Sequence, residues 1–281
     1  MFTLNDRFNI SIDYDAISKI QELEKNSKLT TDDLHFCLLA MVGCMAIHNE
    51  HIPMIFTTLD NIIMTMAQDV NVKVKPKVRT GLMDGFNNLR KHGIIKMNEP
   101  FTGDKKQVVS IVTEELGHYV SKDVKYFQIS RQELAAIIKG SNVPHHLVVI
   151  MINFCSRFNL NAYIDFAEGK WSKKSCSHDS DYASYKRLST WASQDTVRET
   201  WYNEIGKDLK RVKAWEVTDA MFSRYCNELI TLGIFDRIIA NEQGINLSYY
   251  FRPMHRECVE YAIKMNLKQQ AYMKSQQSLQ H

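Results

Sequence analysis

A helix that ends at glycine and leads directly into a hairpin occurs twice in this chain, and this repeat limits the possible folds more than any other pattern in the sequence. In Pro76 to Val112 an amphipathic helical pattern runs up to Gly93, and two short β-like runs follow it. Thr218 to Phe251 repeats this order around Gly233. Glycine ends helices because it adopts left-handed backbone angles without a steric cost. Two short runs around a turn predict a hairpin. We therefore expect two similar structural units.

A helix followed at once by a hairpin is typical of the last helix and wing of a winged-helix domain. The chain has 281 residues, of which 44% are hydrophobic and 24% charged, enough for one large or two medium domains. Its 11 glycines and 5 prolines are few, which favours long helices. We expect a mainly α fold with small β wings, built from two tandem winged-helix (helix-turn-helix) domains. The first covers residues 1–115, a linker covers 116–126, and the second covers 127–281, with a basic helical insertion and a C-terminal helix.

Earlier elements also recur. Phe8-Asn9-Ile10-Ser11 returns as Phe127-Gln128-Ile129-Ser130, and each is followed by a helical pattern. An apolar helix around Leu34 returns from His146 onward. The order of elements repeats, although the offset between the copies drifts, which indicates two structural copies and no short-period solenoid.

The periodicity predicts which helical faces are buried. Thr30 or Thr31 should cap the first long helix, and Thr57 or Thr58 the next. Pro76 suits the first position of the helix that ends near Gly93. The predicted inner faces are Leu34, Cys37, Leu38, Met41, Val42 and Met45 in the first helix, Val78, Leu82, Phe86 and Leu89 in the helix after Pro76, and Met221, Phe222, Tyr225, Leu229 and Leu232 in the last. Outward positions after Pro76 are Lys77, Thr80, Asp84, Asn87 and Lys91.

Overall charge points only weakly to nucleic acid. The net charge is +3 and the pI about 8.4, below the strong basic excess of an obvious nucleic-acid domain. Binding must therefore come from local patches. The sharpest is the alternation Lys73, Lys75, Lys77, Arg79, which approaches a helix start where the helix dipole favours anions. The alternative interpretation of this alternation is a solvated basic loop.

In a helix-turn-helix protein the last helix of the unit enters the major groove with its N-terminal part. Outward polar side chains there reach base edges or phosphates. The expected DNA-binding residues are Lys73, Lys75, Lys77, Arg79, Thr80 and Asn87 in the first copy; Thr218, Ser223, Arg224 and Asn227 in the second; Lys105, Lys106 and Arg237 in the wings, with Arg252 considered for the same role; and Lys186, Arg187, Lys210 and Arg211 in the insertion. In that insertion Trp201 is spaced with Val197 and Ile205, which favours core packing over stacking on bases.

Catalytic and metal-binding motifs are weak. His48-Asn49-Glu50-His51 does not have the spacing of zinc hydrolases, and Cys176-Ser177-His178-Asp179 has no second ligand pair. His145-His146 opens an apolar helix. There is neither a glycine-rich phosphate loop nor a serine-nucleophile elbow. We expect a protein without enzymatic activity, catalytic residues, metal or cofactor.

The six cysteines have no paired short spacing, which predicts a reducing cytoplasm and no disulfides. The N-terminus does not have the pattern of a signal peptide. The longest apolar stretch, Leu34 to Ile47, is too short and too amphipathic to span a bilayer. We expect a cytoplasmic protein without a membrane partner.

Two segments carry a family resemblance: Ser184-Tyr185-Lys186-Arg187-Leu188, and Phe222-Ser223-Arg224-Tyr225-Cys226-Asn227-Glu228-Leu229 leading into Leu232-Gly233-Ile234-Phe235. With them the chain resembles the plasmid and phage replication initiators built from tandem winged-helix domains. The resemblance implies binding to repeated origin sequences and repression of the initiator's own promoter. The long insertion before Thr218 departs from the minimal pattern.

The expected function is sequence-specific binding of double-stranded DNA, with origin recognition in plasmid or phage replication as the first choice. Two alternatives stay open: a transcriptional regulator with the same binding mechanism, and an adaptor that uses winged helices to contact other proteins. A second copy of the chain and the replication or transcription machinery are further partners compatible with the pattern.

Overall fold

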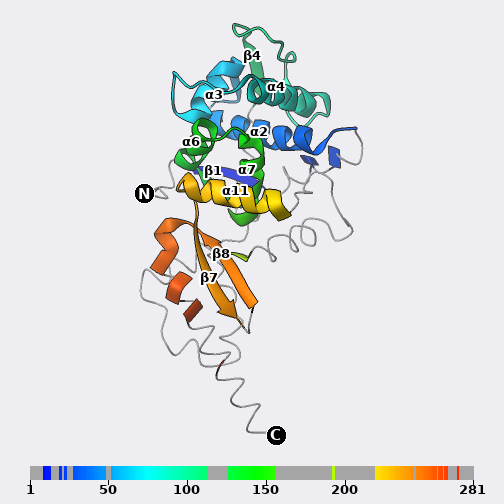
Figure 1. Ribbon diagram of the computed structural model, residues 1–281. Coiled ribbons are helices and arrows are strands. Elements are labelled where there is room, and N and C mark those ends of the chain that lie inside the picture. Colours follow the sequence, from blue (N-terminus) through cyan, green and yellow to red (C-terminus); the bar gives the residue numbers. More distant parts are fainter. Residues whose placement is uncertain are drawn as a thin grey trace. The chain divides into compact units, whose positions relative to one another are not determined.

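The computed structural model describes residues 9–13, 19–20, 22–23, 28–48, 52–112, 126–155, 192–193, 219–242, 245–257, 259–261, 263–264 and 271 (Figure 1). It is mainly helical with small antiparallel sheets, as expected. The described residues fall into two compact units. The helical unit holds those of Phe2–Ser156 and Trp201–Leu232, and the hairpin unit holds those of Arg157–Thr200 and Gly233–His281.

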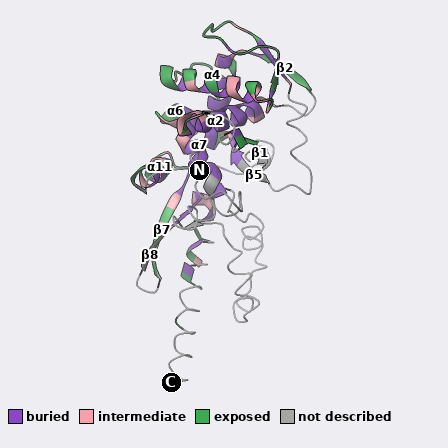
Figure 2. Ribbon diagram, turned by 90° about the vertical axis from the view of Figure 1, so that its right-hand side faces the viewer, coloured by how far each residue is buried: buried purple, intermediate pink, exposed green. Residues whose placement is uncertain are grey.

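Helix α2 (Thr31–Ile47) is the centre of the helical unit. Thr30 caps it: the Thr30 hydroxyl accepts a hydrogen bond from the Asp33 N–H, and the Asp33 carboxylate accepts one from the Thr30 N–H at 2.8 Å. Every residue from Leu34 to Cys44 is buried, so the single predicted stripe was too narrow, and Met45 at its end is only half-buried. The reason is tertiary: α3, α4 and α7 all pack against α2 and bury the stretch from Leu34 to Cys44 on every side. Figure 2 shows α2 as a largely buried helix.

The first helix–hairpin copy contains β2 (Met54–Thr57), α3 (Leu59–Ala67), α4 (Pro76–Lys91), β3 (Lys96–Met97) and β4 (Val109–Val112). The three strands form an antiparallel sheet in the order β2-β4-β3. Thr58 caps α3 by accepting from the Asn61 N–H, and Pro76 opens α4, both as expected. The predicted inner face of α4 is confirmed, because all four of its residues are buried.

Gly93 ends the helical path of α4, as expected. Its φ of 69° is left-handed. The Gly93 N–H bonds the Arg90 carbonyl at 3.0 Å, and the Ile94 N–H bonds the Leu89 carbonyl at 2.9 Å. This pair of bonds is the Schellman arrangement, which satisfies the last helical carbonyls and turns the chain toward β3.

The second copy begins with β5 (Tyr126–Ser130), α6 (Arg131–Gly140) and α7 (Pro144–Cys155), and continues at α11 (Asp219–Thr231). Strand β5 pairs antiparallel with β1 (Asn9–Asp13), so that Ile10 lies opposite Ile129. These two isoleucines hold the same place in the repeated tetrapeptides. The register is therefore symmetric about their pair and relates the two strands by a local two-fold axis.

The hairpin unit contains β6 (Ala192–Ser193), β7 (Asp236–Glu242), β8 (Ile245–Phe251) and a short 3-10 helix, η5 (Pro253–His255). Its strands follow the order β6-β8-β7, the same relative order as β2-β4-β3. Arg256 binds both Asp236 and Glu260. A small apolar core is made by Ala240, Tyr249, Phe251, Val259 and Ile263, with Ile238 packed against it.

Several expectations concern residues outside the described ranges: the linker 116–126 apart from Tyr126, the insertion, the basic segment around Trp201, and the tail. Four cysteines in the described ranges, Cys37, Cys44, Cys155 and Cys226, are buried free thiols. Among the described helices none combines the length and apolar character that a membrane crossing needs.

Candidate nucleic-acid interface

The start of α4 is basic and exposed. Lys75 occupies the N-cap without a side-chain capping bond, Pro76 follows it, and the first turn contains no acidic residue. Lys73, Lys75 and Lys77 are all exposed. The positive end of the helix dipole therefore coincides with positively charged side chains, an arrangement that favours a phosphate.

The four alternating charges differ in what they contact. The ammonium nitrogen of Lys77 lies 3.1 Å from Asp32 Oδ2, and its side chain is 74% exposed. Arg79 Nε donates to Asp60 Oδ1 at 2.9 Å, where the two side chains are 20% and 29% exposed. Lys73 and Lys75 make no ion pair with any residue that the structure describes. These two lysines are therefore the ones available to an anionic partner, whereas Arg79 ties α4 to α3.

The loop between β3 and β4 presents Lys105 and Lys106 on its exposed tip. The Thr102 N–H donates to Gln107 Oε1 at 2.6 Å, and Gln107 Nε2 donates to the Pro100 carbonyl at 3.0 Å. The Lys106 N–H bonds Asp104 Oδ1 at 2.9 Å. Bonds within the loop thus fix its backbone and leave both lysine side chains in solvent.

Asn87 has a different role from the one expected. Its Nδ2 donates to the Phe101 carbonyl at 2.9 Å, and its Oδ1 accepts from the Phe101 N–H at 2.8 Å. The half-buried amide is thereby committed to the hairpin loop, and the Phe101 ring packs edge-on against Phe86. Thr80, in contrast, is exposed, as expected. Asn87 positions the loop relative to α4.

The second copy shows fewer charges. On α11, Arg224 and Asn227 are exposed and Ser223 is half-buried, while Met221 is 42% exposed although the periodicity predicted an inward side chain. On β7, Arg237 is exposed. Arg252 is 2% exposed, so the expectation that its side chain reaches a phosphate is wrong: it turns into the protein interior.

The remaining expected contacts, Lys186, Arg187, Lys210, Arg211 and Thr218, lie outside the described residues. The structure therefore gathers five of the expected residues on the segment that opens α4: Lys73, Lys75, Lys77, Arg79 and Thr80.

A second polar cluster lies where the N-termini of α2 and α7 meet. His146 Nε2 lies 3.2 Å from Asp32 Oδ1, and His145 Nε2 lies 3.6 Å from the same oxygen. His35 Nδ1 and His146 Nδ1 are 2.7 Å apart. The His145 ring stacks on Phe36 with centroids 3.9 Å apart, and the His146 ring stacks on Tyr225 of α11 at 5.1 Å.

The surroundings shift the protonation of this cluster. Burial, reinforced by the neighbouring His146, lowers the pKa of His145 to about 3. Burial also lowers the pKa of His146. For Asp32, burial acts to raise the pKa, but the Lys77 hydrogen bond and the two histidines outweigh it, so the pKa is lowered. The carboxylate is therefore ionised and the buried imidazole of His145 is neutral near neutral pH.

No sequence spacing predicts this cluster, because Asp32 and the His145-His146 pair are more than a hundred positions apart. In the sequence Asp32 only follows the expected helix cap at Thr30 or Thr31, and the two histidines open an apolar helix. Only the packing of α2 against α7 joins them.

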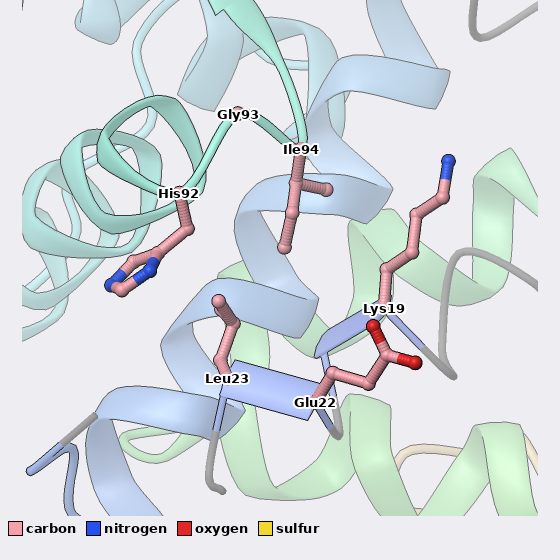
Figure 3. A pocket seen from close by; sticks show the side chains of 6 residues that line it. All are labelled: Lys19, Glu22, Leu23, His92, Gly93 and Ile94. Carbon is pink, nitrogen blue, oxygen red and sulfur yellow. The ribbon is translucent and has the colours of Figure 1, made fainter. Parts of the chain in front are cut away.

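A shallow cavity of about 290 Å³ lies between the helical residues Lys19, Glu22 and Leu23 and the end of α4, at His92, Gly93 and Ile94. Leu23 and Ile94 point toward each other across it (Figure 3). Its lining mixes apolar and polar groups and offers no convergent set of catalytic side chains among those residues.

No protein-family model, no curated protein and no solved structure matches this chain.

Proposed function

We propose that the chain is a sequence-specific double-stranded DNA-binding protein built from two winged-helix units. In this proposal it acts in the cytoplasm, without enzymatic chemistry, as an origin-binding initiator of plasmid or phage replication. Double-stranded DNA is its main partner, with a second copy of the chain and the replication machinery as further partners.

The order of elements supports the winged-helix part of the proposal. From α2 to β4 the elements follow the order helix, strand, helix, helix, strand, strand. The first of these strands, β2, pairs with the last, β4. The hairpin unit repeats the strand order. In this proposal α4 is the helix that enters the major groove, and the β3–β4 loop is the wing.

The observation that carries DNA binding is the uncapped start of α4, where Lys73 and Lys75 are exposed and make no ion pair within the described residues. Phosphate contacts fix the register of a protein on a duplex, and base contacts then select the sequence. Thr80 lies exposed one turn further along the same helix and is the first candidate for a base contact.

Replication is placed before transcription only because of the resemblance carried by residues 184–188 and 222–235. The experiment that tests both is selection of bound sequences from a random duplex library by the full chain, followed by affinity measurements at several salt concentrations. Binding to iterated repeats with a steep salt dependence is the expected result, because phosphate contacts release counterions. Selection of a single palindrome would favour a transcriptional regulator.

One observation favours the protein-contact alternative. Met54, Phe56 and Val108 lie on the solvent face of the β2-β4-β3 sheet or beside it, and Phe56 is 71% exposed. Exposed apolar groups on an edge strand are typical of protein contacts. Absence of duplex binding even at low salt would make the adaptor function the better conclusion.

A further inference from the structure

We propose that Asp32, His145 and His146 form a binding site for a divalent transition-metal ion, with zinc as the ion that fits best. Each of the three residues offers one ligand atom, and these atoms all lie within 4.8 Å of one another. Two imidazoles and one carboxylate are a ligand set that zinc accepts, with a fourth position for water. The proposal is independent of whether the chain binds DNA.

Two of the three distances between the ligand atoms are close to those around a tetrahedral ion. Zinc binds histidine nitrogen at about 2.0–2.1 Å and carboxylate oxygen at about 2.0–2.2 Å, which places ligand atoms roughly 3.3–3.5 Å apart. Asp32 Oδ1 lies 3.2 Å from His146 Nε2 and 3.6 Å from His145 Nε2. All three ligand atoms lie within 4.8 Å of one another, so an ion can bind all of them once the side chains close around it.

His145 supplies the independent sign of a ligand. It is 1% exposed, and neither of its ring nitrogens has a hydrogen-bond partner among the residues that the structure describes. A buried polar group without a partner is costly, and native proteins rarely leave one. A plain ion pair between His146 and Asp32 leaves this imidazole unexplained, whereas a metal on the Nε2 that faces Asp32 gives that nitrogen a partner.

The outer contacts orient the ligands. A metal on His146 Nε2 leaves the proton on Nδ1, and His35 Nδ1 lies 2.7 Å away to accept it. Metal-bound histidines usually donate their second ring N–H in this way, which fixes the ring and its tautomer. Asp32 divides its two oxygens: Oδ1 faces the histidines and Oδ2 accepts from Lys77 at 3.1 Å. Stacking on Phe36 holds the His145 ring.

A metal ion can reach this site from solvent, and its binding would connect two helices. The Asp32 side chain is 41% exposed and that of His146 is 12% exposed, so an ion can enter from solvent. The ligands come from α2 on one side and α7 on the other. A bound ion would therefore link α2 to α7, the two apolar helices that the sequence repeat relates, and would stabilise the helical unit.

The test uses the full chain without an affinity tag, stripped with a chelator and then titrated with Zn²⁺ while the heat of binding is measured. Co²⁺ is the second probe, because its visible spectrum reports tetrahedral coordination by nitrogen and oxygen. We expect the wild-type chain to bind one Zn²⁺ at this site, and its thermal midpoint to rise with Zn²⁺ concentration as linkage requires. In Asp32→Asn and His146→Gln, affinity at this site should fall about tenfold or more.

Asp33→Asn is the matched control. Asp33 stands in the same turn and accepts the capping bond from Thr30. This variant should lose stability yet keep the metal. Asp32 is partly exposed, so Asp32→Asn retains the packing, and circular dichroism checks that it does. Equal zinc affinity and equal thermal shifts in wild type and Asp32→Asn would overturn the proposal, and so would the absence of any Zn²⁺ binding to the wild-type chain.

Discussion

Gly85 of α4 lies directly against the backbone of Phe36 in α2. A Cβ atom at position 85 would lie 2.4 Å from the Phe36 carbonyl oxygen, a distance that real Cβ atoms essentially never show. The Phe36 ring lies against Gly81, one turn earlier on α4. The same ring also stacks on the His145 ring. The close approach of α2 and α4 therefore depends on glycine. Phe36 also contacts His145, which lies beside Asp32 and His146.

Gly85→Ala should destabilise the helical unit by about 3 kcal/mol, because the two helices must move apart. The sign of this change in unfolding free energy tests the close contact, because a glycine-to-alanine substitution at an open helical position stabilises by about 1 kcal/mol. Urea unfolding gives the free energy. Gly103→Ala is the control: nothing lies within 4 Å of a Cβ at that loop position, and the change should stay within about 0.5 kcal/mol. An unchanged stability of Gly85→Ala would contradict the packing.

Replacing both Lys73 and Lys75 with alanine should weaken duplex binding similarly for all sequences and lower the slope of affinity against salt by about two, one for each phosphate contact. Stability should be unaffected, because neither lysine makes an ion pair in the described residues. The measurement is a salt series of binding isotherms. Lys139→Ala, an exposed lysine at the end of α6, serves as control. An unchanged slope in the double variant would remove this segment from the proposed interface.

Asn87→Ala should cost about 1–3 kcal/mol and loosen the β3–β4 loop, because the Phe101 N–H and carbonyl both lose their partner. Hydrogen exchange at the Phe101 amide should accelerate. The neighbouring Asn88→Ala provides the comparison, because it leaves the Phe101 bonds in place. Equal exchange rates in the two variants would show that Asn87 does not position the loop.

Acidification should weaken the hairpin unit through His255. Burial, together with the nearby Arg252 charge, lowers the pKa of His255 from 6.5 to about 4. The folded state therefore binds this proton less tightly than the unfolded state. The stability that neutral His255 contributes is fully present above pH 6.5 and is lost as the pH falls toward 4. Between about pH 7 and about pH 4.5 the loss is on the order of 2 kcal/mol.

The measurement compares urea unfolding of wild type and His255→Gln across this pH range. The variant has no proton to take up at position 255, so the wild type should lose stability relative to it as the pH falls. A stability difference that stays constant with pH would show that His255 titrates alike in both states.

Much of the local structure follows from local chemistry and could be predicted. Thr30, Thr58 and Pro76 start their helices as expected, because a side-chain oxygen or a fixed φ acts on the nearest turn. Gly93 ends α4 and leads to a hairpin for a similarly local reason. The inner face of α4 follows from periodicity, since this helix has one buried side. The repeated tetrapeptides around Ile10 and Ile129 lie in strands that pair with each other, although their repetition did not predict that pairing.

Contacts between distant segments decided the rest. Periodicity assigned one face to α2, but three neighbouring helices bury all sides of it. Asn87 and Arg79 look like exposed recognition residues in the sequence, yet Phe101 and Asp60 engage them. Arg252 is buried, and Met221 is exposed. The clearest case is Asp32 and His146, whose side chains come within 3.2 Å of each other only because α2 packs against α7. A sequence determines what each turn of chain prefers, whereas the partner of a side chain depends on which distant helix is packed beside it.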